Sequence, residues 1–341
     1  MNTDWKLDAK ELYLAYKNKN TSIEDKLKIL ELMYFNNGYK NELFKRRSFK
    51  FRGINQAKDY LLNKMRKDYY ILGEAFIKSI ISLEESKLFE SDIEEPLYIN
   101  NMNKVATITL ELFSKYSIEL FNLASAAIAN KSILVVEDLS SRSFMTPINS
   151  IHKGFCVVDK NDSPDTLAHE IEHLNEYILG YKIPTLYDEL GPITFETLFI
   201  DEMVDSKIPG AELLYFNRLR TTSNYLEDLC GYYKAILYAK KYNFNMSDSK
   251  FILMMNEIMS IEKKYIIEFL SEEYNNNTFF EELIYIISFI KSIDIRNKML
   301  DDKKKGLKEL KKCLNASDIS FNEKKYYESV KRYIKEINRK K

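Results

Sequence analysis

Hydrophobic and polar residues alternate along most of this chain with the spacing of amphipathic helices. Up to about residue 130 the helical pattern is continuous, with clear stretches over about 55–90 and 103–130. Residues 21–25 have the composition of a helix N-terminus, because Thr, Ser and acidic residues precede apolar positions at helical spacing. No repeat of fixed period is present. The pattern therefore predicts a helical N-terminal region.

The pattern changes near residue 131, where short β-branched runs replace the helical spacing. Residues 132–136 (SILVV) and 154–158 (GFCVV) predict two strands. Residues 139–150 between them are rich in Ser, Arg, Thr, Pro and Asn and predict a loop. From about residue 163 the helical pattern returns and continues to the end.

Composition supports a mostly α fold with a small β-sheet. The 341 residues include only nine Gly and six Pro, while 30% are charged and 45% hydrophobic. Few chain breakers and many helix formers are typical of helical proteins. The length fits one large domain or two lobes. We expect a helical N-terminal lobe over residues 1–130 and a catalytic region over residues 131–341, which can form one continuous domain.

Charge and hydropathy argue against nucleic-acid and membrane roles. Lys and Arg total 51, Asp and Glu also total 51, and the formal net charge is zero. The basic C-terminal stretch is interleaved with acids, which favours a solvated helix face. No run of about 18 uncharged apolar residues occurs, and the N-terminus lacks a signal-peptide pattern. We expect neither nucleic acid nor a membrane as a partner.

The cysteines predict the compartment. Cys156, Cys230 and Cys313 are an odd number and lie far apart in the sequence. They indicate free, buried thiols in a reducing environment. We therefore expect a cytoplasmic protein.

A His-Glu-x-x-His motif carries the candidate chemistry. Residues one helical turn apart lie on one face, so His169 and His173 can bind one zinc ion. Glu170 lies beside the first histidine and can act as general base on a water at the metal. The chain has only three histidines, which makes this spacing less expected by chance. The alternative is two surface histidines on an amphipathic helix.

The surrounding residues predict a helix. Ser163 is suited to the N-cap, Pro164 to the first helical position and Asp165 to the positive end of the helix dipole. Gly180 is suited to the C-terminus. Apolar positions at helical spacing exclude both histidines: Leu167, Ile171, Leu174 and Ile178.

A third zinc ligand is needed, and no histidine follows His173. We expect a carboxylate from a following helix. Glu189 and Glu196 are seven residues apart and share a helical face, so one can bind zinc while the other orients a histidine. Pro192 leaves the choice open. A helix that begins at Pro192 includes only Glu196, whereas a helix that runs through it is kinked after Glu189.

These segments resemble the oligoendopeptidase F and thimet oligopeptidase family of zinc metallopeptidases. The matching residues are 154–158, 166–173 and 189–196, within a strong resemblance over about 150–205. The resemblance implies a zincin-like, mostly helical, two-lobed peptidase with a deep channel. It also implies cleavage of short peptides, aligned by backbone groups of residues 154–158.

Carried over by residue, the resemblance implies one zinc ion held by His169, His173 and Glu189, with Glu196 as its supporting neighbour. The chain departs from the family pattern at Glu172, where glycine is common. The interval from His173 to Glu189 is shorter than in the family, and the short chain implies trimmed N-terminal helices.

An additional donor is expected for the negatively charged oxygen that forms during peptide hydrolysis. Residues 225–235 resemble the tyrosine-rich helix that supplies this donor in the family. Tyr232 is the first candidate, followed by Tyr225 and Tyr233, although ordinary packing is the alternative in a chain with 24 tyrosines. The remaining histidine, His152, is expected at the surface or in a supporting position.

The sequence thus predicts a zinc-dependent metalloendopeptidase acting on short oligopeptides, with Glu170 and zinc activating water. One alternative is a catalytically inactive zincin-like binding protein. Another is a helical interaction module that carries the motif by chance and binds nucleic acid through its basic C-terminus. The latter predicts no stoichiometric zinc.

Overall fold

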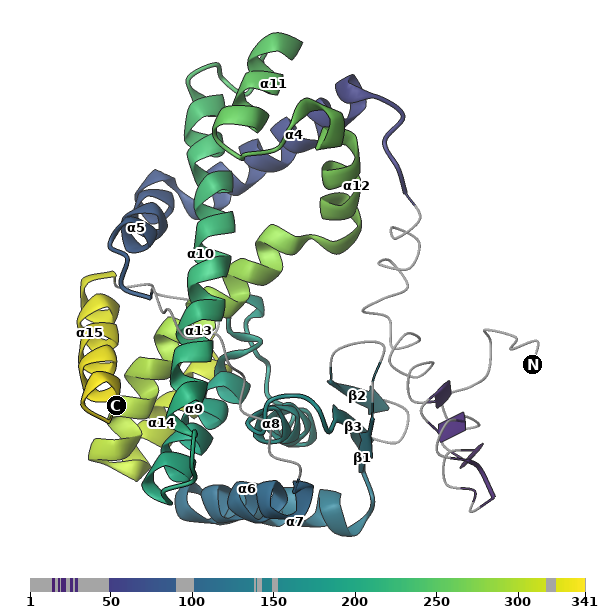
Figure 1. Cartoon of the computed structure of the whole chain (residues 1–341), viewed down its shortest axis with the longest axis vertical. Coiled ribbons are helices and arrows are strands. Elements are labelled where there is room, and N and C mark those ends of the chain that lie inside the picture. Colours follow the sequence, from purple (N-terminus) through teal and green to yellow (C-terminus); the bar gives the residue numbers. More distant parts are fainter. Residues whose placement is uncertain are drawn as a thin grey trace.

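The computed structural model describes residues 49–89, 101–137, 143–148, 153–316 and 323–340, together with scattered positions within 14–29 and residue 139. In this part of the chain the protein is mostly helical, with one small sheet (Figure 1). The predicted fold class is therefore confirmed. His152 lies outside the described residues, and so does part of the predicted helix start at residues 21–25.

Helices precede and follow the sheet. Those before it are α4 (Ile54–Leu72), α5 (Glu74–Glu85), α6 (Met102–Tyr116) and α7 (Ile118–Ala129). Those after it are α8 (Thr166–Leu179), η2 (Thr185–Tyr187), α9 (Leu190–Asp205), α10 (Glu212–Lys240), α11 (Asp248–Glu257), η3 (Lys263–Tyr265), α12 (Ile266–Asn276), α13 (Thr278–Asp301), α14 (Lys303–Leu314) and α15 (Glu323–Lys340).

Single residues divide the long helical stretches of the N-terminal region. Gly73 separates α4 from α5 with φ +80°, a left-handed conformation that glycine adopts readily. Ser117 separates α6 from α7, and its side chain accepts a hydrogen bond from the Leu120 N–H as an N-cap. Helices α4 and α5 pack on α10. The division at residue 130 stays a prediction.

The sheet contains β1 (Ile133–Val136), β2 (Phe144–Ile148) and β3 (Lys153–Asp159), in the order β1-β3-β2. Strand β3 pairs in parallel with β1 and antiparallel with β2. Strand β2 lies inside the segment predicted as a loop, so that prediction is wrong there. Its proline is compatible with an edge strand. Strand β3 is the central strand, and its residues 156 and 157 pair on both sides. The expectation that residues 154–158 align a peptide stays a prediction.

The motif helix α8 packs between β3 and α9. Leu167, Ile171 and Leu174 are buried as predicted, and Gly180 ends the helix at φ +68°. The predicted start was two residues too early. Asp165 occupies the N-cap position, and the Ser163 hydroxyl donates to its carboxylate.

Helix α9 begins at Leu190, so Pro192 falls within its first turn. A proline is accommodated there because the first helical N–H groups have no partner within the helix. The helix packs against α8 and α13 and is buried on most sides. Glu189 consequently becomes its N-cap residue, at the end that faces the motif helix.

The three cysteines are free and buried, as predicted. Within the described residues, every helix is too short or too polar to cross a bilayer.

Candidate metal centre

Helix α8 places the two motif histidines on one face. The rings of His169 and His173 lie 4.9 Å apart between centroids and are inclined by 78°. Their side chains are 13% and 21% exposed, on the opposite side from the buried apolar stripe. The separation of a polar face from a core face therefore follows the sequence pattern.

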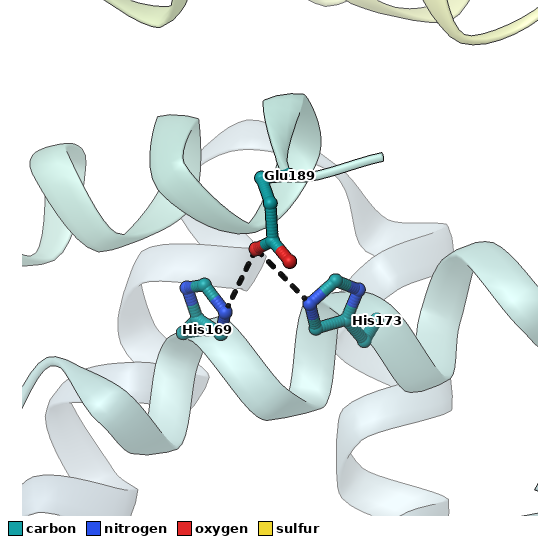
Figure 2. Close-up of side chains that lie close together, drawn as sticks. All are labelled: His169, His173 and Glu189. Carbon is teal, nitrogen blue, oxygen red and sulfur yellow. Dashed lines mark ion pairs between the residues drawn. The ribbon is translucent and has the colours of Figure 1, made fainter. Parts of the chain in front are cut away.

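Glu189 reaches this face from the start of α9 (Figure 2). Its Oε2 atom lies 3.2 Å from His169 Nε2 and 3.4 Å from His173 Nε2. Ligand atoms of the three residues all lie within 4.8 Å of one another. Glu189 Oε2 is buried and has no hydrogen-bond partner. Two imidazole nitrogens and a carboxylate oxygen that converge in this way form a suitable donor set for a zinc ion.

Glu196 lies on the other side of His169. Its Oε2 atom is 3.3 Å from His169 Nδ1, and its carboxylate forms an ion pair with Arg218 of α10. Arg218 also lies 3.6 Å from Asp165. A carboxylate on Nδ1 favours the tautomer with a proton there, which leaves the Nε2 lone pair for a metal. The structure thus groups Glu189 with the two histidines and places Glu196 behind one of them.

Glu176 has the corresponding position behind His173. Its Oε2 atom is 4.0 Å from His173 Nδ1, and neither carboxylate oxygen has a hydrogen-bond partner. A Cβ atom at Gly191 would lie 1.9 Å from Glu176 Oε1, so this glycine leaves the space that the carboxylate occupies. The roles of Glu176 and Gly191 were not predicted from the sequence. Glu176 could have been found as an acidic residue one helical turn after His173.

The charges of the glutamates and histidines in the centre shift one another's pKa values. Burial raises the pKa of Glu189, but the two histidines outweigh it and hold the pKa below its usual range. Burial opposes protonation of His169, yet Glu189 raises its pKa. Burial raises the pKa of Glu170, and the charges of the histidines oppose that rise. Glu170 is 5% exposed, so its carboxyl group is shielded from bulk water.

The tyrosines predicted as donors lie farther along α10. Tyr232 donates a hydrogen bond to Asp68 (2.7 Å), and its ring stacks on Phe279. Arg218 is the residue of α10 that contacts Glu196 at the metal centre. Tyr232 follows it by 14 residues, about 21 Å along the helix axis. The structure therefore does not bring Tyr232 to the metal centre.

Tyr225 and Tyr233 differ in their surroundings. Tyr233 is buried and its hydroxyl has no hydrogen-bond partner. Tyr225 is partly exposed, and its ring lies 5.7 Å from that of Tyr285. It is about 10 Å along α10 from Arg218, the shortest such interval among the three candidates. Its role as a donor stays a prediction.

No protein-family model and no curated protein matches this sequence. Among solved structures, the chain is similar to a protein from Chlamydophila abortus assigned as a peptidase, with a TM-score of 0.50 and 12% identity over 98% of this chain and 63% of that one. It is also similar to a Bacillus anthracis protein assigned as an oligoendopeptidase F, with a TM-score of 0.45 and 14% identity over 93% of this chain and 61% of that one.

A third similar structure is PZ peptidase A with an inhibitor, with a TM-score of 0.46 and 13% identity over 95% of this chain and 64% of that one. The chain spans less than two thirds of the length of each of these proteins. At 12% identity, the similarity to the Chlamydophila protein shows a shared fold.

Proposed function

We propose that this protein is a zinc-dependent metalloendopeptidase that hydrolyses short oligopeptides. The convergence of His169, His173 and Glu189 carries the proposal, because their ligand atoms lie within 4.8 Å of one another. The Oε2 atom of Glu189, which is buried and faces the Nε2 atoms of both histidines, supports it further. A carboxylate oxygen in that position is costly unless a proton or a metal compensates it.

The bound metal would supply a Lewis acid that polarises the peptide carbonyl and makes water acidic. Glu170 accepts a proton from the attacking water and delivers it to the leaving amine. Glu196 and Glu176 orient the imidazoles of His169 and His173 through their Nδ1 atoms. The order β1-β3-β2 places β1 and β2 at the edges of the described sheet, and an extended peptide can align along an edge strand.

Metal analysis together with a peptide panel tests the proposal. The purified protein should contain one zinc ion per chain, and quenched peptides of roughly 5 to 15 residues should be cleaved. A chelator should stop cleavage, and added zinc should restore it. Stoichiometric zinc without cleavage of any peptide would favour the inactive zincin-like alternative. Absence of stoichiometric zinc would refute both the peptidase proposal and the inactive zincin-like alternative.

A further inference from the structure

A second group of acidic residues belongs to α4, α10, α12 and α13, and two of its members lie one helical turn from the ring pair of Tyr225 and Tyr285. Asp228 follows Tyr225 by three residues on α10, and Glu282 precedes Tyr285 by three on α13. Residues three apart on a helix share a face. We name the group the acidic seam, and it comprises Asp68, Asp228, Glu273, Glu281 and Glu282.

Glu282 has no compensating partner. Glu282 is 6% exposed, and its buried Oε2 atom has no hydrogen-bond partner. Among the described residues, none places a cation within ion-pair distance of it. Burial first, and then the charges of Asp228, Glu273 and Glu281, raise the pKa of Glu282 to about 8. Every charged group that acts on this carboxyl is therefore an acid.

Glu273 is only partly compensated. It is 2% exposed, and its Oε2 atom accepts a hydrogen bond from the Phe279 N–H at 3.3 Å. Its Oε1 atom has no hydrogen-bond partner, and the nearest cation, Lys64, lies 3.7 Å away. Lys64 is also shared with Asp68 at 3.5 Å. Lys64 thus lies near two carboxylates, and among the described residues no cation pairs with Glu282.

Helix α13 connects the seam to the turn that precedes Glu189. Ser288 of α13 donates a hydrogen bond to the Leu186 carbonyl (3.3 Å), in the turn that leads to Glu189. Glu282 precedes Ser288 by six residues, about 9 Å along the helix. Asp228 is exposed, which leaves the seam open to solvent at α10.

We propose that Asp228 and Glu282 form a specificity subsite for a positively charged group of the peptide, an ammonium or guanidinium. The subsite rests on the proposed peptidase function. Buried carboxylates without partners favour an incoming cation, which here replaces the proton on Glu282 and forms charge-assisted hydrogen bonds. The cation also relieves the repulsion among the neighbouring acids.

Peptide binding to the full-length Glu170→Gln variant tests the subsite without turnover. Fluorescent, N-acetylated peptides carry either one lysine, moved stepwise along the sequence, or glutamine at the same position. We expect the best lysine peptide to bind about 10-fold more tightly than its glutamine counterpart. Adding Glu282→Gln should reduce that ratio to about one. Peptides with a free N-terminus and no lysine tell whether a terminal ammonium serves equally well.

Two matched variants complete the test. Glu282→Asp retains the charge and should retain most of the lysine preference. Glu257→Gln removes an exposed acid of α11 outside the seam and should leave the preference unchanged. Circular dichroism verifies that each variant is folded. Equal binding of lysine and glutamine peptides, or a preference that survives Glu282→Gln, overturns the subsite.

The subsite and the peptidase proposal fail in different ways. Lysine-selective binding to Glu170→Gln, with no cleavage by the unsubstituted protein, would remove the peptidase function and keep a cation-selective peptide site. Cleavage of lysine and glutamine peptides at equal kcat/KM would keep the peptidase and remove the subsite.

Discussion

Glu189 Oε2 lies 3.2 Å from His169 Nε2, although Glu189 is the N-cap residue of α9 and His169 belongs to α8. This contact joins two helices at the point where three donor atoms converge. Replacement of Glu189 by alanine removes one of the three proposed zinc ligands. We therefore expect Glu189→Ala to contain less than about a tenth of the zinc of the unsubstituted protein, measured by metal analysis after dialysis.

Glu196→Ala is the matched comparison. Glu196 contacts His169 Nδ1 at 3.3 Å, on the far side of the ring from Glu189. Its loss should leave the zinc ligands in place and weaken zinc affinity by about 10- to 100-fold, as read from competition with a chelating dye. Full zinc in Glu189→Ala together with zinc loss in Glu196→Ala would reverse the assignment of the third ligand.

Glu170→Gln separates metal binding from proton transfer. Glutamine has nearly the same shape as glutamate but accepts no proton, so zinc content should be unchanged while kcat falls by about 10²- to 10⁴-fold. Glu172→Gln, a buried neighbour on α8, provides the control. Its pKa is raised by burial to about 8, so the neutral amide resembles the protonated carboxyl. Unchanged peptide cleavage by Glu170→Gln would exclude Glu170 as the base.

A glycine substitution tests the space behind the metal centre. Gly191→Ala would place a Cβ atom 1.9 Å from Glu176 Oε1, so the carboxylate must move away from His173. We expect lower zinc affinity and a free energy of unfolding reduced by about 1 to 3 kcal/mol. Denaturant titration and zinc competition give both readouts.

Gly231→Ala on α10 is the control for that substitution. Its Cβ would meet only ordinary contacts, the nearest at 3.5 Å. In a helix interior this change should stabilise the protein by about 0.5 to 1 kcal/mol. If Gly191→Ala behaves like Gly231→Ala in both measurements, the space at Gly191 has no role in positioning Glu176.

Local patterns predicted the motif helix and the shared face of His169 and His173, because helical spacing alone decides which residues share a face. The apolar stripe of α8 and the polar face with His169 and His173 follow from that rule. Strand β2 was missed because the Ser and Pro residues around it are typical of a loop, and its pairing depends on β3.

The rest of the site depends on tertiary contacts. Sequence spacing could not decide whether Glu189 or Glu196 is the third ligand. Which of them faces the two histidines depends on where α9 begins relative to α8. Arg218 reaches Glu196 from a helix that begins more than ten residues later. Tyr232 has the residue type and the spacing of a donor, but the packing of α4 directs its hydroxyl to Asp68.

The acidic seam predicts a dependence of stability on pH. The pKa of Glu282 rises from 4.5 to about 8 on folding, chiefly through burial. Below about pH 4.5 both the folded and the unfolded states bind the proton, and the residue has no effect on stability. Between pH 4.5 and 8 only the folded state retains it, so the free energy of unfolding falls as pH rises. The full loss is present above pH 8.

Glu282→Gln removes this titration, because the amide resembles the protonated carboxyl at every pH. Relative to the unsubstituted protein, the variant should show about equal stability at pH 4 and a gain on the order of 3 kcal/mol at pH 9. Each tenfold change in proton affinity corresponds to about 1.4 kcal/mol, and contact of the seam with solvent reduces the full value. Urea titrations at pH 4, 6.5 and 9 measure the difference, with Glu257→Gln as the control. A stability difference that does not vary with pH would mean that Glu282 titrates alike in the folded and unfolded chains, and the seam would then lack the uncompensated acid on which cation binding depends.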